Sequence, residues 1–134
     1  MAKYTTYIVS ENARAQAEFY THALGGEIVS VMTHGQLPGA AEKLKDKVVN
    51  LSFVAGGIHF MMSDSVFEPV IQGNAINLSF EFATEVEARE AFAKLAEGGK
   101  IICPLEPAFW GSLFGQIEDP FGIRWMITTA APTA

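Results

Sequence analysis

The sequence has a single cysteine, Cys103, and no long apolar run among its 134 residues. One cysteine excludes an intramolecular disulfide framework and a cysteine-rich metal site. No run approaches the roughly 20 apolar residues that a membrane-spanning helix needs. The opening segment MAKYTTYIVS also lacks the charged and apolar regions of a signal peptide. We therefore expect a cytoplasmic protein without a membrane partner.

Positive charge is also scarce. Lys and Arg number 9 against 15 Asp and Glu, which gives a net charge of −6. No basic cluster interrupts this balance, so a nucleic-acid partner is not expected. Apolar residues make up 49% of the chain and charged residues 18%, a composition that excludes disorder. The length suits one domain, which we take to be residues 1–134.

Common catalytic and cofactor motifs are missing. There is no GxGxxG or P-loop to bind a dinucleotide or nucleotide phosphate, and no GxSxG or HExxH to indicate a hydrolase. We therefore expect no cofactor. The histidines are scattered, with His22 on a predicted helix, His34 in a loop and His59 on a predicted strand.

The chain repeats one order of elements, strand–helix–strand–strand–strand. Phe19 and Phe92 lie 73 positions apart, and so do the pairs Gly25-Gly26 and Gly98-Gly99 that end the two predicted helices. Ser10 or Asn12 can cap the first helix, and Thr84 begins a capping box before the second. The expected helices are residues 12–24 and 85–97, and the expected strands are Tyr4–Val9, Glu27–Met32, Val48–Ala55, Ile58–Ser63, Ile76–Phe82, Lys100–Cys103, Leu113–Glu118 and Ile123–Thr128.

This repeat predicts an α+β fold of two βαβββ modules in tandem, covering about residues 3–65 and 74–130. Each helix should cover the apolar face of its own sheet. The two curved mixed sheets should then surround a concave cup, with the helices on the outer face.

Period-two alternation assigns the faces of the strands. Leu78 and Phe80 alternate with Asn77, Ser79 and Glu81 in one strand. Trp125 and Ile127 alternate with Arg124 and Met126 in another, and Phe60 and Met62 alternate with His59 and Met61 in a third. The first strand is ambiguous on pattern alone.

The polar faces either meet water, as in many antiparallel sheets, or line the cup. Methionine side chains and Trp110 favour a cup, because small-molecule sites combine apolar walls with a few polar groups. We expect Trp110 to reach the rim from the Pro104–Ser112 loop. The candidate ligand-binding residues are Tyr7, His59, Met61, Asn77, Ser79, Glu81, Trp110, Arg124 and Met126.

Other roles remain open for some of these residues. His59, Glu81 or Tyr7 could transfer protons in an enzyme, because histidine titrates near neutral pH. Glu81 and Arg124 could instead form a structural pair. Cys103 is expected to be buried and inert.

Several segments together resemble the vicinal oxygen chelate superfamily, which includes the glyoxalase I and bleomycin-resistance families, and within it the PhnB-like branch. The resemblance covers essentially the whole chain. It is carried by Ala17-Glu18-Phe19-Tyr20, Leu24-Gly25-Gly26, the segment Ile58–Asp64, Trp110-Gly111 and the segment Gly115–Trp125 with its DPFG sequence.

The resemblance implies a metal site whose four ligands come from four strands of the cup. The matching positions are Thr5, Met61, Asn77 and Met126, where the superfamily's metalloenzymes carry His at the first and third and Glu at the others. Thr, Asn and two thioethers do not make a site for a divalent cation, so we expect no bound metal. PhnB-like proteins often carry quinone methyltransferase names, but a glycine-rich strand-to-helix turn for that cofactor is missing.

The superfamily also completes its cups across subunits, so a homodimer is expected. The leading hypothesis is a metal-free homodimer that binds a small organic molecule in its cups. The alternatives are an enzyme of the superfamily, lyase-like or dioxygenase-like with unknown substrate, or a structural dimer with vestigial cups.

Overall fold

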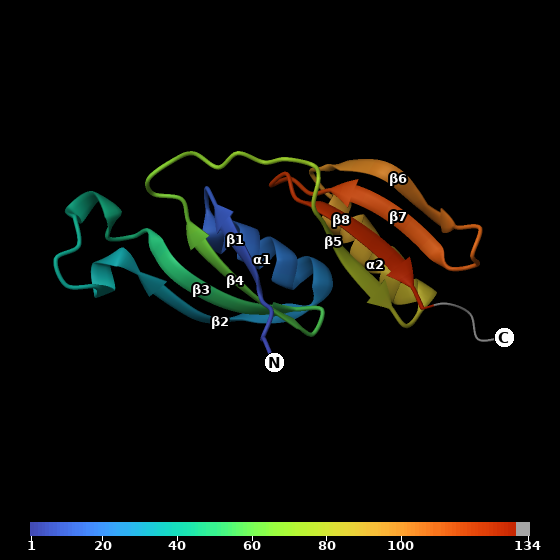
Figure 1. The fold of residues 1–134 in the computed structure, drawn as a ribbon, viewed down its shortest axis with the longest axis horizontal. Coiled ribbons are helices and arrows are strands. Elements are labelled where there is room, and N and C mark those ends of the chain that lie inside the picture. Colours follow the sequence, from blue (N-terminus) through green and yellow to red (C-terminus); the bar gives the residue numbers. More distant parts are fainter. Residues whose placement is uncertain (131–134) are drawn as a thin grey trace. The chain divides into compact units, whose positions relative to one another are not determined.

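Each half of the chain forms a four-stranded mixed sheet with one helix packed against it (Figure 1). The structure is a computed structural model, and it describes residues 1–130. The chain divides into two compact units, residues 1–71 and the segment from residue 72 onward. The predicted α+β fold with two tandem βαβββ modules is confirmed.

The first unit has the strand order β1-β4-β3-β2. Strand β1 runs parallel to β4, and the other neighbours are antiparallel. Two short 3-10 turns, η1 and η2, lie between β2 and β3. The elements are β1 (Thr6–Ser10), α1 (Ala13–Leu24), β2 (Gly26–Thr33), η1 (His34–Gln36), η2 (Glu42–Leu44), β3 (Val48–Ala55) and β4 (Ile58–Asp64).

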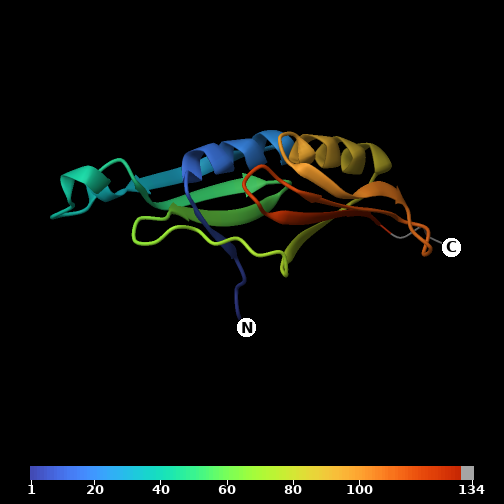
Figure 2. The same cartoon turned by 90° about the horizontal axis from the view of Figure 1, so that it is seen from above.

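The second unit repeats this topology, with the strand order β5-β8-β7-β6 and β5 parallel to β8. Its helix also lies against one face of its own sheet (Figure 2). Within residues 1–130, neither helix is long and apolar enough to cross a membrane. The elements are β5 (Asn77–Phe82), α2 (Glu85–Ala96), β6 (Lys100–Pro107), β7 (Leu113–Glu118) and β8 (Arg124–Thr129).

Both helices begin at the predicted caps. The Asn12 side chain accepts a hydrogen bond from the backbone N–H of Ala15 at 3.2 Å. The Thr84 hydroxyl accepts one from the backbone N–H of Glu87 at 3.2 Å. It also donates to the Glu87 carboxylate at 2.8 Å. The second capping box therefore differs from expectation, because the Glu87 carboxylate binds the Thr84 hydroxyl and not its backbone N–H.

The paired glycines at the helix ends serve two different needs. Gly25 and Gly98 adopt φ values of 78° and 79°, in the left-handed region that favours glycine. The second glycine of each pair lies against a neighbouring strand. A Cβ atom on Gly26 would lie 1.8 Å from the carbonyl oxygen of Val54, and one on Gly99 would lie 2.0 Å from that of Glu118. Both positions therefore require glycine.

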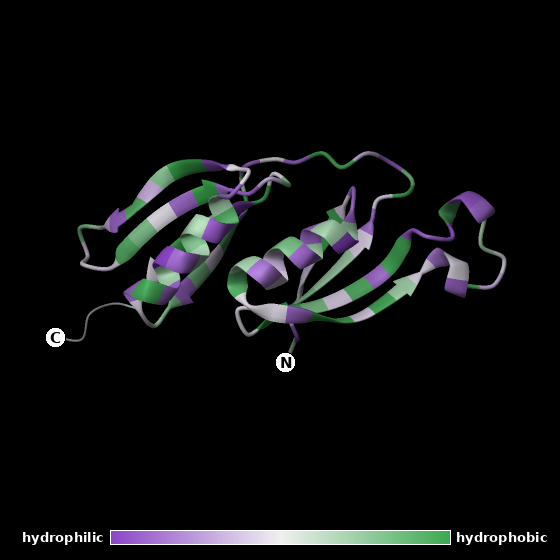
Figure 3. Cartoon of the chain, turned by 180° about the vertical axis from the view of Figure 1, so that it is seen from behind, coloured by the Kyte–Doolittle hydropathy of each residue, from purple (hydrophilic) through white to green (hydrophobic). Residues whose placement is uncertain are grey.

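The apolar residues of each unit gather between its helix and its sheet. Apolar and polar residues alternate along the strands and helices in Figure 3. In the first unit, Phe53 and Phe60 stack with ring centroids 5.1 Å apart, and Tyr20 is fully buried. In the second unit, Trp125 and Ile127 are fully buried. Burial of each such side chain contributes about 1.5–3 kcal/mol to folding.

Several predicted element boundaries are wrong. Strand β5 begins at Asn77, and Ile76 before it is 82% exposed. Strand β6 continues to Pro107, four residues beyond the predicted end at Cys103. In β3, alternation predicts Val49 on the buried side with Leu51 and Phe53. Val48 is buried instead, because the pairing with β2 is irregular near Thr33. Such an irregularity turns one residue out of the alternating pattern.

Candidate functional site

The sheet of the second unit has a polar face turned away from α2, which we call the second open face. Trp125 and Ile127 of β8 are fully buried, so the residues between them point to the opposite side. The parallel pairing places Asn77 opposite Arg124 and Ser79 opposite Met126. The second open face therefore carries the predicted candidates Asn77, Ser79, Glu81, Arg124 and Met126.

Strand β7 adds residues that the sequence reasoning missed. Leu113 and Ile117 are buried, and a Cβ atom on Gly115 would lie 2.6 Å from the ring of Phe92 on α2. The alternate residues Phe114, Gln116 and Glu118 must lie on the second open face. The same alternation applied to β7 would have found them.

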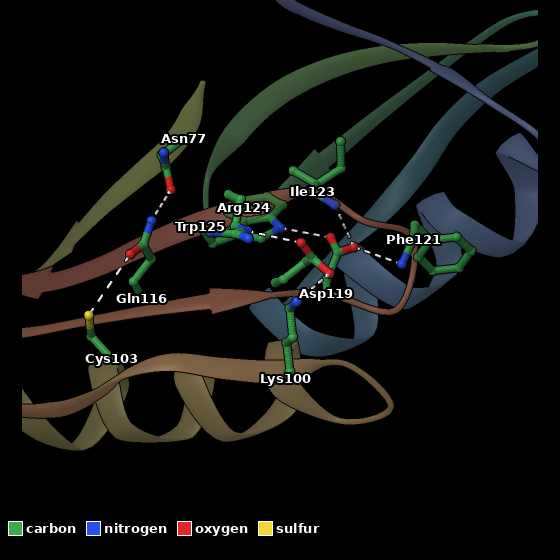
Figure 4. Close-up of polar contacts among 10 residues, drawn as sticks. Asn77, Lys100, Cys103, Gln116, Asp119, Phe121, Ile123, Arg124 and Trp125 are labelled. Carbon is green, nitrogen blue, oxygen red and sulfur yellow. Dashed lines mark hydrogen bonds and ion pairs between the residues drawn. The ribbon is translucent and has the colours of Figure 1, made fainter. Parts of the chain in front are cut away.

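An amide bridge crosses this face (Figure 4). The Gln116 Nε2 atom donates a hydrogen bond to Oδ1 of Asn77 at 2.7 Å. The Gln116 Oε1 atom accepts from Sγ of Cys103 at 4.0 Å. Gln116 lies on β7 and Asn77 on β5, so the bridge passes over the intervening strand β8. Cys103 is half-buried, so the predicted full burial of this residue is wrong.

A charged cluster lies beside the bridge. The Arg124 Nε atom is 2.9 Å from Oε1 of Glu118, and Nζ of Lys100 is 3.8 Å from Oε2 of the same carboxylate. The hydrogen bond from Arg124 lowers the pKa of Glu118 below its ordinary value, and the positive charge of Lys100 acts in the same direction. Arg124 thus pairs with Glu118, which answers the alternative of a structural pair between Glu81 and Arg124 in favour of a different carboxylate. A depression of about 500 Å³ adjoins this cluster, lined by Gln72, Gly73, Asn74, Glu118, Gly122 and Arg124.

Trp110 lies in the turn between β6 and β7. The backbone N–H of Gly111 donates to the carbonyl of Ala108 at 2.9 Å, which closes the turn. The Trp110 ring packs edge-on against Phe114 of the second open face, with centroids 6.0 Å apart, and its residue is 49% exposed. The indole is therefore outside the main core. Its loop is shorter than the predicted Pro104–Ser112, because β6 extends to Pro107.

The face of the first sheet that is turned away from α1, the first open face, is more apolar. Ile8 and Ser10 are buried, whereas Tyr7 and Val9 are about half exposed. This burial settles the orientation that the sequence left ambiguous. Tyr7 pairs with Met61, and His59 lies one alternate position away on β4. The first open face therefore carries the candidates Tyr7, His59 and Met61.

A hollow of about 340 Å³ lies at the end of the first sheet and was missed by the sequence reasoning. It is assembled from the ends of several elements and a following loop, so no local pattern marks it. His34, predicted to lie in a loop, is part of its lining. The lining residues are Val9, His34, Val48, Val49, Ser63, Asp64, Ser65, Val66, Phe67 and Glu68.

The buried Asp119 explains the DPFG sequence in physical terms. Its Oδ1 atom accepts hydrogen bonds from the backbone N–H groups of Phe121 at 2.8 Å and Ile123 at 3.1 Å. Its Oδ2 atom accepts from Nε1 of Trp125 at 2.8 Å (Figure 4). The carbonyl of Asp119 accepts from the N–H of Gly122 at 3.0 Å, which closes a β-turn over these four residues. Asp119 therefore shapes the turn and anchors the largest core side chain.

The metal-ligand positions implied by the resemblance do not fit a divalent cation. They hold Thr5, Met61, Asn77 and Met126, and the Asn77 carboxamide is already bound by Gln116. In the part of the chain that the structure describes, no three His, Cys, Asp or Glu side chains gather closely enough to hold a metal ion. No glycine stands between β1 and α1 or between β5 and α2, so the cofactor turn of a methyltransferase is missing there.

Comparison with known proteins supports the resemblance. Among solved structures, PA1353 from Pseudomonas aeruginosa has a TM-score of 0.84 and 30% identity, covering 96% of this chain and 98% of that one. A Bacillus cereus PhnB protein, described as a putative 3-demethylubiquinone-9 3-methyltransferase, has a TM-score of 0.80 and 31% identity, covering 96% and 100%.

A curated relative is also similar. Protein YjdN of Escherichia coli K12 is 25% identical over 120 residues, which cover 81% of this chain and 82% of YjdN. The model of the Glyoxalase/Bleomycin resistance protein/Dioxygenase superfamily matches residues 3–127. The PhnB-like neighbours agree with the branch that the sequence resembles. This chain belongs to the glyoxalase/bleomycin resistance protein/dioxygenase superfamily.

Proposed function

We propose that this protein is a metal-free member of the superfamily that binds a small organic molecule in the cup of a homodimer. The second open face supplies the polar contacts of the site. The observation that carries the proposal is the amide bridge between Gln116 and Asn77. Asn77 occupies one of the positions that the resemblance assigns to a metal ligand, and here its side chain is part of a hydrogen-bonding surface.

The chemistry of this face suits an organic ligand. The Asn77 amide nitrogen remains as a donor beside the bridge, and the Arg124 guanidinium is held in place by Glu118. Trp110 and Phe114 offer an apolar edge at the other end of the same face. A few oriented polar groups beside aromatic side chains are the usual composition of a small-molecule site.

Native mass spectrometry of protein purified without added metal tests the metal, the oligomer and the ligand together. We expect the mass of a dimer, no stoichiometric metal and a co-purified organic mass. One Ni, Zn or Mn ion per chain would overturn the metal-free assignment. A stable dimer interface buries more than about 1,000 Å² in total, so the dimer should persist at micromolar concentration. A monomer in sedimentation at that concentration would contradict the dimer.

The aromatic edge can be tested with the fluorescent dye 8-anilinonaphthalene-1-sulfonate as a planar probe. Trp110→Ala should weaken dye binding by about two- to tenfold, the usual contribution of an aromatic contact. Val86→Ala is the control, because Val86 is 66% exposed on α2, which covers the opposite face of the sheet. Equal effects of the two substitutions would contradict a site beside Trp110.

A further inference from the structure

We propose that the hollow at the end of the first sheet binds a small organic cation, an ammonium group carried on an apolar body. The hollow adjoins the first open face through Val9, but none of the candidate ligand-binding residues lines it. The inference therefore goes beyond the proposed function and stands independently of it.

The walls of the hollow are apolar and its size suits a small molecule. The volume of about 340 Å³ falls in the range of small-molecule pockets. Four valines line it, together with the Phe67 ring. Phe67 is 90% exposed, so its aromatic face is available to a ligand. The valines are Val9, Val48, Val49 and Val66.

The charge of the lining selects the kind of ligand. Asp64 and Glu68 bring two carboxylates, whereas the lining includes no Lys or Arg and a single imidazole, that of His34. The Asp64 carboxylate accepts hydrogen bonds from the neutral backbone N–H groups of Ala13 at 2.7 Å and Val48 at 2.8 Å. Neither carboxylate forms an ion pair within residues 1–130. An anionic ligand would be repelled, whereas a cation would be attracted.

The two carboxylates do not contribute equally. Ala13 begins α1, so the dipole of this helix offsets part of the negative charge on Asp64. Glu68 lies in the loop after β4 and is exposed. The Phe67 ring beside it adds attraction for an ammonium group, because a cation binds the negative face of an aromatic ring. Glu68 and Phe67 are therefore the residues to vary.

The loop that carries these two residues is tied to β1 and to the turn that follows it. The backbone N–H of Ser65 donates to the carbonyl of Ser10 at 2.7 Å, and the N–H of Val70 donates to the Glu11 carboxylate at 2.7 Å. The Ser65 hydroxyl donates to the carbonyl of Glu68. A wall held by these bonds loses little entropy when a ligand binds.

Two probes of equal shape separate charge from hydrophobicity. Choline carries a quaternary ammonium group, and 3,3-dimethylbutan-1-ol replaces its nitrogen with carbon. We expect choline to shift the amide NMR signals of Ser63, Val66 and Phe67 in a saturable titration, with a weaker response to the alcohol. Equal shifts with the alcohol would overturn the proposal, because the hollow would then select only apolar shape.

Substitutions at the hollow complete the test. Phe67→Ala and Glu68→Gln should each raise the Kd for choline by about two- to fivefold, the usual range for an exposed cation–π contact or charge pair. Both residues are exposed, so the fold should survive. Phe109→Ala and Glu90→Gln are the matched controls in the other unit and should leave the Kd unchanged. An unchanged Kd in both Phe67→Ala and Glu68→Gln would overturn the assignment.

Choline binding in the hollow should not depend on the second open face. Trp110→Ala should leave choline binding unchanged while it weakens dye binding. Loss of dye binding alone would leave the hollow supported. Loss of choline binding in Trp110→Ala would place the cation on the second open face and overturn the assignment to the hollow.

Discussion

The two units share one topology but use different chemistry at equivalent places. The hairpin between β3 and β4 turns at Gly56 and Gly57, whose φ values of 59° and 80° lie in the left-handed region. The corresponding turn between β7 and β8 relies on Asp119, which accepts three hydrogen bonds. The first turn depends on backbone freedom, whereas the second combines a left-handed glycine, Gly122 at φ 91°, with a buried carboxylate.

The two open faces also differ in how many of their side chains bond to one another. The first open face is bordered by the half-exposed Tyr7 and Val9. The second open face is tied together by the amide bridge and by the ion pair between Arg124 and Glu118. A duplicated fold can therefore keep its core and assign different surfaces to its two copies.

The largest expected effect comes from Asp119. Asp119→Ala removes the carboxylate that accepts three hydrogen bonds, one of them from Nε1 of the buried Trp125. Unpaired buried donors are costly, so we expect the free energy of unfolding to fall by about 3 kcal/mol or more. Urea denaturation measures this change. The exposed Asp46→Ala in the first unit is the control, and an equal loss there would contradict the structural role of Asp119.

The matching turn of the first unit should be less sensitive. An added Cβ on Gly57 meets nothing within 4 Å, so Gly57→Ala is strained only through its positive φ. We expect a loss of about 1–2 kcal/mol in the same denaturation experiment. Gly57→Asn should lose less, because Asn tolerates this conformation better than Ala. A loss in Gly57→Ala larger than that in Asp119→Ala would reverse the comparison.

The amide bridge should contribute less than either turn. Gln116→Ala removes the hydrogen bond to Asn77 on a half-buried face, and the expected loss of stability is about 1 kcal/mol. Dye binding should fall in the same variant, since the Asn77 side chain is no longer held. A stable variant with unchanged dye binding would contradict the role of the bridge in the site.

The sequence predicted the features that depend on short-range patterns. Helix ends followed from caps and paired glycines, and strand faces followed from period-two alternation. Boundaries were wrong where the local pattern was continuous, as at β6, whose residues beyond Cys103 still pair with β7. The bulge that buries Val48 in place of Val49 depends on pairing with a distant strand, which a local pattern does not encode.

The candidate site was predictable only in part. Alternation placed Arg124 on the second open face, but the choice between Glu81 and Glu118 as its partner depends on strand order. In the sheet, Glu118 pairs directly with Arg124 across β7 and β8, whereas Glu81 faces Thr128. The hollow in the first unit combines three strand ends, the turn η1 and a loop, so only the three-dimensional structure brings its residues together.

The smallest expected effect is a pH dependence at Glu118. Its pKa lies below the ordinary value of about 4.5 because Arg124 donates a hydrogen bond to it and Lys100 lies nearby. A carboxyl whose pKa is lower in the folded state stabilises the fold above its unfolded pKa. This contribution is lost as the pH falls through the lowered folded pKa. The second unit should therefore lose some stability in acid through this residue.

Glu118→Gln removes this titration. Its stability should fall less steeply than that of the wild type as the pH drops below about 4.5, as measured by thermal unfolding across a pH series. The effect should be small, and added salt should weaken it, because Lys100 and Glu118 are partly exposed. Glu90→Gln is the control, since Glu90 forms no ion pair within residues 1–130. If Glu118→Gln and the wild type lost stability in parallel through this range, Arg124 would not stabilise the folded state through Glu118, and the charged cluster would serve only the ligand site.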